Sequence, residues 1–404
     1  MSKFPPVDEQ LARIKRGVVD LVQEPLLRAR LEESRQKQQP LRVKFGIDPS
    51  SPDIHIGHTV PLRKLRSFQE LGHLPVIIWG SATARVGDPT GKSKTRPQLT
   101  LDQVRENLAT YQAQIGKVLD IDACEQHENG EWFDSMGFAD FIRLMGRMTV
   151  ARAIENDTVG KRLEKQEPVS LHELIYPLMQ GQDSVEIRCD VEIGGSDQLY
   201  NLLVGRMLQE QAGQAPQVCL TMPIIEGLDG VQKMSKSLGN YIGIHDQPKD
   251  MFGKVMSVPD ELMQKYFLLL TDTSPEEIET LLAGHPREAK ATLAERITAD
   301  LHGEAAGREA RAEFDRVFQQ KALPSEIPER DCDPEWMRDG EVLVAVLVHK
   351  LGLAQSGSEA RRLIQQKGVK VDGEAVQGER PSLKPGSYLL QVGRRKFVQV
   401  RIPD

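Results

Sequence analysis

The sequence predicts an α/β fold with a parallel sheet, and three consecutive stretches near its beginning indicate this. Residues 42–47 and 75–79 are short β-rich or apolar runs bounded by turn signals, and both are expected to be strands. Residues 57–70 lie between them and have helical character. Pro61, which is allowed only in the first turn of a helix, places the helix start near His58. A strand, a helix and a second strand in this order are typical of a right-handed crossover between parallel strands.

The remaining elements follow from the same kinds of pattern. Charged residues with apolar positions at helical spacing predict one or two amphipathic helices over residues 8–38, and Thr100 with Gln103 predicts the capping box of another helix. Further helices are expected over residues 139–165, 171–183, 248–320 and 358–366, and further strands over 187–193 and 218–225. Residues 323–341 are rich in Pro, Asp and Glu and predict a linker to a small α+β domain over residues 342–404.

The composition narrows the class of protein. The chain has 404 residues, enough for two to four domains at about 100–200 residues each. Its net charge of −7 argues against general binding to DNA or RNA, but it allows a local basic face, because counter-ion release depends on the patch. No apolar run reaches the length of about 18 residues that a membrane span needs, and no apolar signal region begins the chain, so we expect a cytoplasmic protein without a membrane partner. The four cysteines are scattered, which favours a reducing compartment and no structural zinc.

The first chemical motif is a pair of histidines at a strand-to-helix turn. Residues 53–58 place His55 and His58 three residues apart at a helix N-terminus. Helix N-termini attract phosphate through free N–H groups and the helix dipole, and Gly57 lets a base or a phosphate approach the backbone. The alternative interpretation is a pair of ordinary surface histidines.

The second motif is a loop that carries two lysines among small residues. Lys233 and Lys236 belong to the string Lys-Met-Ser-Lys-Ser, which follows a glycine-containing stretch over residues 227–230. Lysines on a mobile loop can bind a polyphosphate while its charge moves during a reaction. Binding of this kind stabilises the transition state. The alternative interpretation is a solvated basic loop.

Together, in this order and at this separation, the two motifs match the signature motifs of class I aminoacyl-tRNA synthetases. Residues 40–241 resemble the bacterial tyrosyl-tRNA synthetases in particular, and the resemblance continues to the C-terminus. The stretches that carry it are Gly46-Ile47-Asp48-Pro49-Ser50, Gly87-Asp88-Pro89-Thr90-Gly91-Lys92, Tyr176 with Gln180 and Asp183, and Gly194-Gly195-Ser196-Asp197-Gln198 with Asn201. The resemblance implies a Rossmann-like catalytic domain over residues 1–225, with a helical dimer-interface insertion at about 130–180. It also implies an α-helical anticodon-side domain with the lysine loop over residues 226–322.

The resemblance also implies roles for individual residues. The catalytic residues, which contact the ATP phosphates or close over the pyrophosphate, would be His55, His58, Lys92, Arg96, Lys233 and Lys236. The residues that hold the ammonium and phenol groups of tyrosine would be Asp88, Tyr176, Gln180 and Asp183. The residues that line the ATP and adenylate site would be Asp48, Gly57, Gly195, Asp197, Gln198 and Lys236. The chemistry agrees, because an ammonium group needs a carboxylate and neutral acceptors, and a phenol needs a buried acceptor. Without the resemblance, the polar residues over 171–183 would be compatible with the surface of an amphipathic helix.

Two stretches depart from the pattern of these relatives. The relatives usually carry a carboxylate and an aromatic residue where this chain has Ser81 and Ala82, and Arg85 follows. Glu186 and Arg188 stand where relatives tend to carry small or apolar residues. A buried unpaired charge is costly, so Arg85 is expected to have a carboxylate partner. The candidate partners of Arg85 are Glu186, Asp183 and Asp88. These changes leave an alternative function open, a paralogous synthetase with a pocket reshaped for a tyrosine analogue or for inhibitor resistance.

Residues 342–404 resemble an S4-type RNA-binding domain, and the match is centred on residues 358–373. The basic residues that would contact tRNA phosphates are Arg361, Arg362, Lys367, Lys370, Arg394 and Arg395. The alternative interpretation is a solvated helix face. Deleting residues 341–404 is expected to spare adenylate formation and to cripple tRNA charging.

The reaction that the resemblance implies has two steps. The carboxylate of L-tyrosine attacks the α-phosphorus of ATP, which is a substrate bound with Mg²⁺, and the 3′-terminal adenosine of tRNA(Tyr) then takes the acyl group. Catalysis is positioning and charge stabilisation, without a side-chain nucleophile or a protein-ligated metal. The family is homodimeric. Two rival classes are a nucleotidyltransferase that acts without tRNA, which the S4-like region opposes, and a non-catalytic RNA-binding relative, which the intact histidines and lysines oppose.

Overall fold

The computed structural model describes residues 4–51, 53–90, 99–318, 327–378, 380–393 and 396–403. The chain divides into two compact units, Met1–Arg311 and Ala312–Asp404. Residues 226–311 therefore belong to the same unit as the larger sheet, and the boundary expected at residue 226 does not separate compact units. Within the described ranges, no helix is long and apolar enough to cross a membrane.

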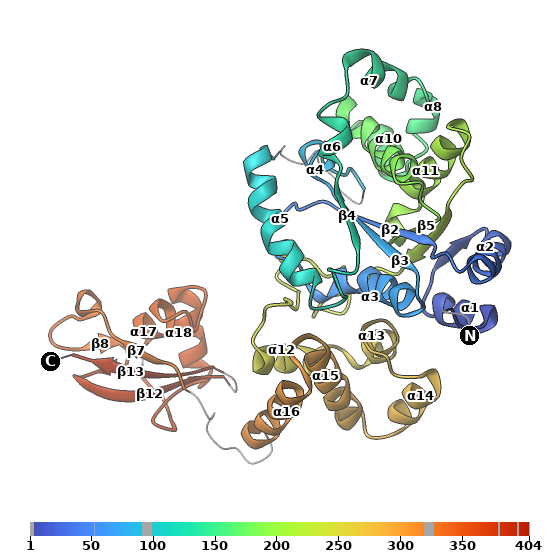
Figure 1. The fold of residues 1–404 in the computed structure, drawn as a ribbon. Helices are drawn as coiled ribbons and strands as arrows, with labels where there is room; N and C mark the ends of the chain where they lie inside the picture. Colours follow the sequence, from blue (N-terminus) through green and yellow to red (C-terminus); the bar gives the residue numbers. More distant parts are fainter. Residues whose placement is uncertain are drawn as a thin grey trace. The chain divides into compact units, whose positions relative to one another are not determined.

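The first unit is built on a sheet with the strand order β1-β6-β5-β2-β3-β4 (Figure 1). Its strands are β1 (Asp20–Val22), β2 (Arg42–Ile47), β3 (Leu74–Trp79), β4 (Glu125–Glu128), β5 (Val191–Gly195) and β6 (Val218–Met222). All neighbouring pairs among β2 to β6 are parallel, and β1 is antiparallel to β6. The chain moves outward from β2 through β3 and β4 and then returns to β5 on the other side of β2. The carboxyl ends of β2 and β5 therefore mark the switch point at which parallel sheets bind ligands.

The predicted parallel strand–helix–strand unit is confirmed, because the strands expected over residues 42–47 and 75–79 are β2 and β3. Strand β4 was not predicted, because its sequence Glu-Gln-His-Glu has no apolar pattern. Strand β5 begins later than expected, because the preceding helix continues to Glu186.

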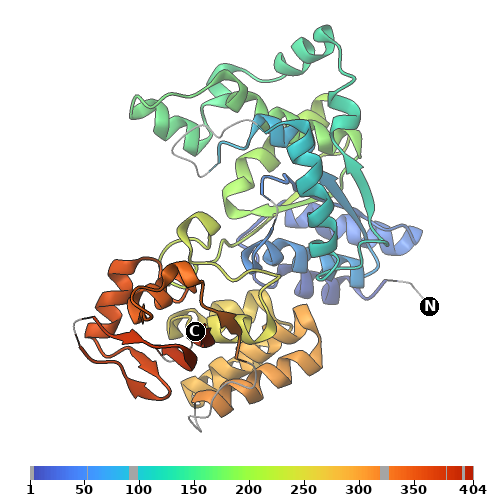
Figure 2. The ribbon, with the colours of Figure 1, turned by 90° about the vertical axis from the view of Figure 1, so that its left-hand side faces the viewer.

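The helices of the first unit surround the sheet (Figures 1 and 2). Their bounds are α1 (Val7–Lys15), α2 (Glu24–Lys37), α3 (Ile56–Glu70), α4 (Thr83–Val86), α5 (Leu101–Ile115), α6 (Gly130–Phe133), α7 (Phe138–Met145), α8 (Val150–Ala153), α9 (Asp157–Glu164), α10 (Leu171–Glu186), α11 (Leu199–Gln211), α12 (Pro248–Val255), α13 (Met263–Leu270), α14 (Pro275–Ala283) and α15 (Pro286–His302). The predicted capping box of α5 is present, with Thr100 and Gln103 exchanging hydrogen bonds at 3.0 and 3.3 Å. The single helix expected over residues 139–165 is instead the three short helices α7, α8 and α9.

Helix α3 begins at Ile56, earlier than the start expected near His58. His55 is the N-cap residue, so Pro61 lies inside the helix and not in its first turn. Because Pro61 has no N–H, it cannot donate the helical hydrogen bond to the carbonyl of Gly57. The expectation was wrong because the cap made by the histidine side chain determines the start of this helix.

Helices α12 to α15 and helices α7 and α8 lie at opposite ends of the first unit in both views (Figures 1 and 2). Ion pairs tie the former group to α3, with Arg63 Nη2 2.7 Å from Asp272 Oδ1 and Arg66 Nη1 3.1 Å from Asp300 Oδ1. The helix that begins with the histidine motif is thereby anchored at its other end.

The second unit combines helices with a small sheet, and helix α16 (Glu304–Phe318) runs across the division between the units. Its other elements are α17 (Val344–Lys350), α18 (Gly357–Gln365), β7 (Glu329–Asp331), β8 (Val342–Leu343), β9 (Val369–Val371), β10 (Glu374–Ala375), β11 (Ser382–Leu383), β12 (Gly386–Val392) and β13 (Lys396–Ile402). The main sheet has the order β10-β9-β12-β13-β7, and β8 pairs with β11. The helix expected over residues 358–366 is α18.

Part of the expected linker over residues 323–341 is ordered structure. Strand β7 pairs in parallel with β13, and Cys332, directly after it, is buried in the core of the second unit. The small sheet therefore includes a strand that precedes residue 342. This strand was not predicted, because the stretch has a polar composition.

Candidate active site

A cavity of about 760 Å³ lies at the carboxyl ends of the parallel strands. The ends of β2 and β5, the start of α3, one face of α10 and the lysine loop line it. The predicted site residues among its lining are Asp48, His55, Gly57, His58, Asp88, Tyr176, Gln180, Asp183, Gly195, Asp197, Gln198, Lys233 and Lys236. The predicted residues Lys92, Arg96, Arg394 and Arg395 lie outside the described residues. Residues predicted from separate motifs thus share one cavity at the switch point of the sheet.

The two histidines form the cap of α3 and are not free surface residues. His55 Nδ1 accepts a hydrogen bond from the N–H of Gly57 at 3.2 Å, and His58 Nδ1 accepts one from the N–H of His55 at 3.2 Å. The ring centroids are 3.9 Å apart. Because each Nδ1 is an acceptor, the neutral rings carry their protons on Nε2 and can donate from there.

Both imidazoles are neutral at ordinary pH. Burial, followed by the charges of His58 and Lys236, lowers the pKa of His55 to about 2. Burial is also the main reason that the pKa of His58 is lowered to about 4. The helix start therefore offers neutral N–H donors together with its dipole, an arrangement that stabilises added negative charge without a proton transfer.

Gly57 is held against one of these rings. A Cβ atom at this position would lie 2.9 Å from the Nδ1 and Cε1 atoms of His55. The absence of a side chain at position 57 is therefore required by the cap itself.

The lysine loop reaches the histidine end of the same cavity. Lys236 Nζ is 3.2 Å from Asp53 Oδ2, two residues before His55. Met234 is buried, and its N–H donates to the carbonyl of Ile225 at 2.9 Å, so the loop is anchored between the two lysines. The lysine side chains and the histidine rings consequently face one space, although about 180 residues separate them in the sequence.

The polar face of α10 forms the opposite end of the cavity. Tyr176 donates its phenolic hydrogen to Asp48 Oδ2 at 2.9 Å. Asp88 Oδ2 accepts a hydrogen bond from Gln198 Nε2 at 2.8 Å, and its other oxygen accepts the N–H of Thr90 at 2.9 Å. These bonds hold two carboxylates and a phenolic oxygen in fixed positions, as recognition of an ammonium group requires.

Asp183 is the most deeply enclosed carboxylate of this end. It is 3% exposed, and it accepts hydrogen bonds from Trp132 Nε1 at 3.0 Å and Asn129 Nδ2 at 3.3 Å. Burial raises the pKa of Asp183 to about 7, while the charge of Lys44 and the two hydrogen bonds oppose the rise. A buried carboxylate whose two oxygens are already oriented by donors is suited to accept one further hydrogen bond from a ligand hydroxyl.

Asn129 and Trp132 were not among the predicted site residues. Asn129 directly follows β4, and its side chain also accepts the N–H of Ala82 at 2.8 Å and donates to Thr83 Oγ1 at 3.0 Å. Residues at the carboxyl ends of parallel strands are common site residues, so identification of β4 would have revealed it. The polar sequence of β4 hid that signal.

The residues that depart from the family pattern lie outside this cavity. Arg85 forms an ion pair with Asp134, so none of its three expected partners is correct. Ser81 Oγ accepts the N–H of Gly130 at 2.9 Å, which ties it to the segment after β4. Ser81, Ala82 and Arg85 are not among the residues that line the cavity, although Gly80, Thr83 and Ala84 of the same stretch are.

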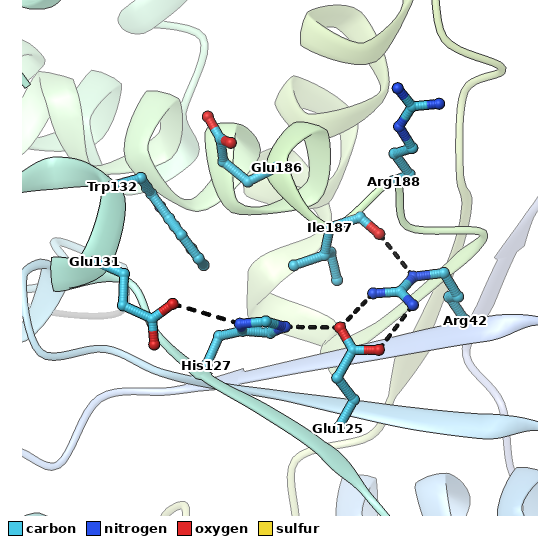
Figure 3. A pocket seen from close by; sticks show the side chains of 8 residues that line it. All are labelled: Arg42, Glu125, His127, Glu131, Trp132, Glu186, Ile187 and Arg188. Atoms are coloured by element: carbon cyan, nitrogen blue, oxygen red, sulfur yellow. Dashed lines mark hydrogen bonds and ion pairs between the residues drawn. The ribbon is translucent and has the colours of Figure 1, made fainter.

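Glu186 and Arg188 belong to a separate hollow of about 440 Å³ (Figure 3). Its lining is Arg42, Glu125, His127, Glu131, Trp132, Glu186, Ile187 and Arg188. Trp132 separates the two spaces, because its ring lines this hollow while its N–H donates to Asp183. Glu186 accepts a hydrogen bond from Gln182 Nε2 at 2.8 Å. Glu186 and Arg188 are therefore placed outside the main cavity, on the far side of Trp132 from Asp183.

Among the described side chains, no group of three or more His, Cys, Asp and Glu residues is arranged to hold a metal ion. In the second unit, the predicted basic residues Arg361, Arg362, Lys367 and Lys370 are all exposed. They lie on α18, on the turn after it and on β9.

The comparisons with known proteins agree with this geometry. The family described as tRNA synthetases class I (W and Y) matches residues 36–319, and the S4 domain matches residues 336–380. The chain is 48% identical over 406 residues to the tyrosine–tRNA ligase of Carboxydothermus hydrogenoformans, which covers 98% of this chain and 99% of that protein. It is 48% identical over 400 residues to the tyrosine–tRNA ligase of Thermotoga maritima, covering 97% of each.

Solved structures show the same fold. The tyrosyl-tRNA synthetase complexed with L-tyrosine from Archaeoglobus fulgidus has a TM-score of 0.60 at 22% identity, covering 76% of this chain and 100% of that chain. A C-terminally truncated mitochondrial tyrosyl-tRNA synthetase from Aspergillus nidulans has a TM-score of 0.64 at 23% identity, covering 77% and 94%. The resemblance read from the sequence is thus confirmed, and the chain belongs to the tyrosyl-tRNA synthetase family of class I synthetases, with a C-terminal S4 domain.

Proposed function

We propose that the protein is a tyrosine–tRNA ligase. It activates L-tyrosine with ATP to tyrosyl-adenylate and pyrophosphate, and then transfers tyrosine to the 3′ end of tRNA(Tyr). The observation that carries this proposal is a single cavity with a buried, doubly hydrogen-bonded Asp183 at one end and the histidine and lysine motifs at the other.

The amino-acid end accounts for the choice of substrate. Asp183 accepts the phenol hydrogen bond, while Asp88, Tyr176 and Gln180 receive the ammonium group. Phenylalanine has no hydroxyl group, so it would leave the buried carboxylate without one hydrogen-bond partner and without water in its place. The pocket therefore disfavours phenylalanine.

The phosphate end accounts for activation. When the tyrosine carboxylate attacks the α-phosphorus, negative charge builds on the phosphate oxygens and on the leaving pyrophosphate. The neutral Nε2–H groups of His55 and His58 and the N-terminus of α3 stabilise this charge, and Lys233 and Lys236 close over the pyrophosphate. No side chain forms a bond to the substrate. Mg²⁺ enters with ATP and neutralises part of the phosphate charge. Lys92 and Arg96 are assigned to the phosphate end from the sequence alone.

The second unit supplies the tRNA contact. Exposed Arg361, Arg362, Lys367 and Lys370 suit the phosphate backbone of RNA, to which the S4 match also points. Exchanging Arg361 and Arg362 for alanine should leave adenylate formation unchanged and weaken tRNA charging, and it should make tRNA binding less sensitive to salt, because fewer phosphates are neutralised. An equal loss of both activities would contradict this division of labour.

We further propose a homodimer that works in the cytoplasm, where translation takes place. Large apolar side chains are exposed along α7 to α10, and they are Phe138, Ile142, Met145, Val150, Ile154, Leu163 and Leu171. An exposed apolar surface of this extent is typical of a protein interface. Exchanging Phe138, which is 82% exposed, for aspartate should produce monomers in analytical ultracentrifugation.

The decisive experiment is ATP–pyrophosphate exchange with each of the twenty amino acids and with tyrosine analogues. Exchange that depends on tyrosine, with an ordinary kcat/KM for it, supports the proposal. Efficient exchange only with an analogue would instead indicate the paralogous synthetase, and no exchange at all would indicate a non-catalytic relative.

A further inference from the structure

An ion pair lies directly beneath the amino-acid end of the cavity. Lys44 of β2 and Glu192 of β5 are partners in the register of the two parallel strands, and their side chains are 0% and 1% exposed. Lys44 Nζ is 2.9 Å from Glu192 Oε1. Removing two charges from water is expensive, and replacing such a pair by apolar residues is often neutral or stabilising. Stability alone therefore does not explain why the pair lies at the switch point of the sheet.

The pair converges on two residues of α10. Lys44 Nζ donates to the main-chain carbonyl of Gln180 at 2.7 Å and to Ser184 Oγ at 2.8 Å, so its three protons are all used. Glu192 Oε1 accepts a hydrogen bond from Gln180 Nε2 at 3.1 Å, and Glu192 Oε2 accepts one from Ser184 Oγ at 3.2 Å. Gln217 Nε2 also donates to Glu192. Both the main chain and the side chain of Gln180 are therefore held by this one pair.

These bonds determine which way the amide of Gln180 faces. An ionised carboxylate can only accept hydrogen bonds, so the NH₂ group of Gln180 must face Glu192. The carbonyl oxygen of the same amide is then the group left for the cavity, which Gln180 lines. A carbonyl oxygen accepts a hydrogen bond from an ammonium group, whereas an NH₂ group in its place would repel it.

We propose that Glu192, held by Lys44, is a positioning residue that fixes the Gln180 carbonyl toward the ammonium group of the amino-acid substrate. The pair thereby helps the site to select α-amino acids over phenolic acids that lack the amino group. This inference rests on the proposed function, since it assigns the ammonium group to the cavity end formed by α10.

Replacing Glu192 by glutamine tests the inference with little change of shape. An amide at position 192 can both donate and accept, so the amide of Gln180 is free to turn. The measurements are the KM and kcat for L-tyrosine in pyrophosphate exchange and the inhibition constant of 3-(4-hydroxyphenyl)propionate, which keeps the phenol and the carboxylate but lacks the ammonium group. We expect the KM for tyrosine to rise about tenfold, the effect of losing one hydrogen bond to a charged group, with kcat changed less. The inhibition constant should stay within about twofold.

Two further variants keep the test decisive. Glu192→Gln leaves Lys44 buried without its charge partner, and this single variant could fail to fold for that reason. The double variant Lys44→Met/Glu192→Gln removes both charges and should show the same selective rise in the KM for tyrosine. Ser184→Ala removes one hydrogen bond from each member of the pair but leaves the Gln180 amide bound to Glu192, and it should affect tyrosine and the propionate equally.

An equal loss for tyrosine and the propionate in the Glu192 variants, or an unchanged KM for tyrosine, would overturn the positioning role. If the unaltered protein shows no tyrosine-dependent exchange, the proposed function fails instead, so the two failures are distinguishable.

Discussion

The two ends of the cavity are built in different ways. At the phosphate end, His55 and His58 are held by main-chain hydrogen bonds at a helix start, and Lys236 is held by one exposed carboxylate. At the amino-acid end, Asp183 and Gln180 belong to a buried network with several partners each. In the proposed reaction, neutral donors and lysines on a loop would stabilise the charge that moves. A substrate group that stays in place would instead bind to acceptors that are oriented beforehand.

The largest effect that should separate the two ends is a loss of kcat on replacing His55 by alanine. We expect kcat in pyrophosphate exchange to fall about 10²–10³-fold, as for removal of one donor to a developing charge, with the KM for tyrosine within about twofold. The matched control is His285→Ala. His285 caps α15 by accepting the N–H of Arg287 at 3.2 Å, the same distance as in the His55 cap. Each variant should lose about 1 kcal/mol of unfolding free energy, but only the first should lose activity. Similar activity losses in both would mean that His55 acts through stability alone.

The next largest effect should follow from replacing Asp183 by asparagine. The NH₂ group of the new asparagine would then face the N–H donor of either Trp132 or Asn129, so two hydrogen-bond donors would oppose each other. We expect kcat/KM for tyrosine to fall about 100-fold, with a smaller loss for phenylalanine. The control is Asp134→Asn, a half-exposed carboxylate outside the cavity, which should change kcat/KM little. A uniform loss for both amino acids would remove Asp183 from substrate selection.

The two ends should also respond differently to pH. Asp183 must be ionised to accept the phenol hydrogen bond, and burial raises its pKa to about 7, so the competent form is lost as the pH falls through 7. At pH 6 about one molecule in ten is competent, and the KM for tyrosine should be about tenfold higher than at pH 8. The histidines, with pKa values of about 2 and 4, stay neutral over this range. The KM for ATP should therefore be nearly constant, and a flat KM for tyrosine would contradict the assignment of Asp183.

The smallest effect should come from Trp132→Phe. This change removes the indole N–H that donates to Asp183 but keeps a ring between the cavity and the outer hollow. We expect the KM for tyrosine to rise about three- to tenfold at pH 8 and its pH dependence to move to higher pH, because one bond that favours the ionised carboxylate is lost. Trp336→Phe, in the second unit, should change neither quantity.

The two signature motifs were easier to predict from the sequence than the network around Asp183. The histidine and lysine motifs are local strings whose chemistry is visible without the fold, and they do share one cavity. The position of the histidines after β2, at a strand-to-helix turn, also followed from the strand–helix–strand pattern, whereas the lysine loop follows β6. The start of α3 was misplaced, because the rule for Pro61 competed with a cap made by a histidine, which is an unusual capping residue.

The network around Asp183 and Gln180 could not be predicted in the same way. Trp132 reaches Asp183 across 51 positions of sequence, and Lys44 meets Glu192 only because β2 and β5 are neighbours in the sheet. A lysine or a glutamate in a strand is ordinarily exposed, so neither buried charge carried a local signal. The same limit explains why Arg85 was given the wrong partners.

Gly57 has an evolutionary consequence. A Cβ atom there would lie 2.9 Å from the imidazole that caps the helix, so we expect even alanine to displace this ring. A saturation library at this codon, selected for growth on the encoded enzyme alone, should return only glycine. The neighbouring codon for Ile56, a buried aliphatic residue, should return several aliphatic side chains. Two adjacent positions would then differ in mutational freedom because one of them lies against the imidazole that caps the helix.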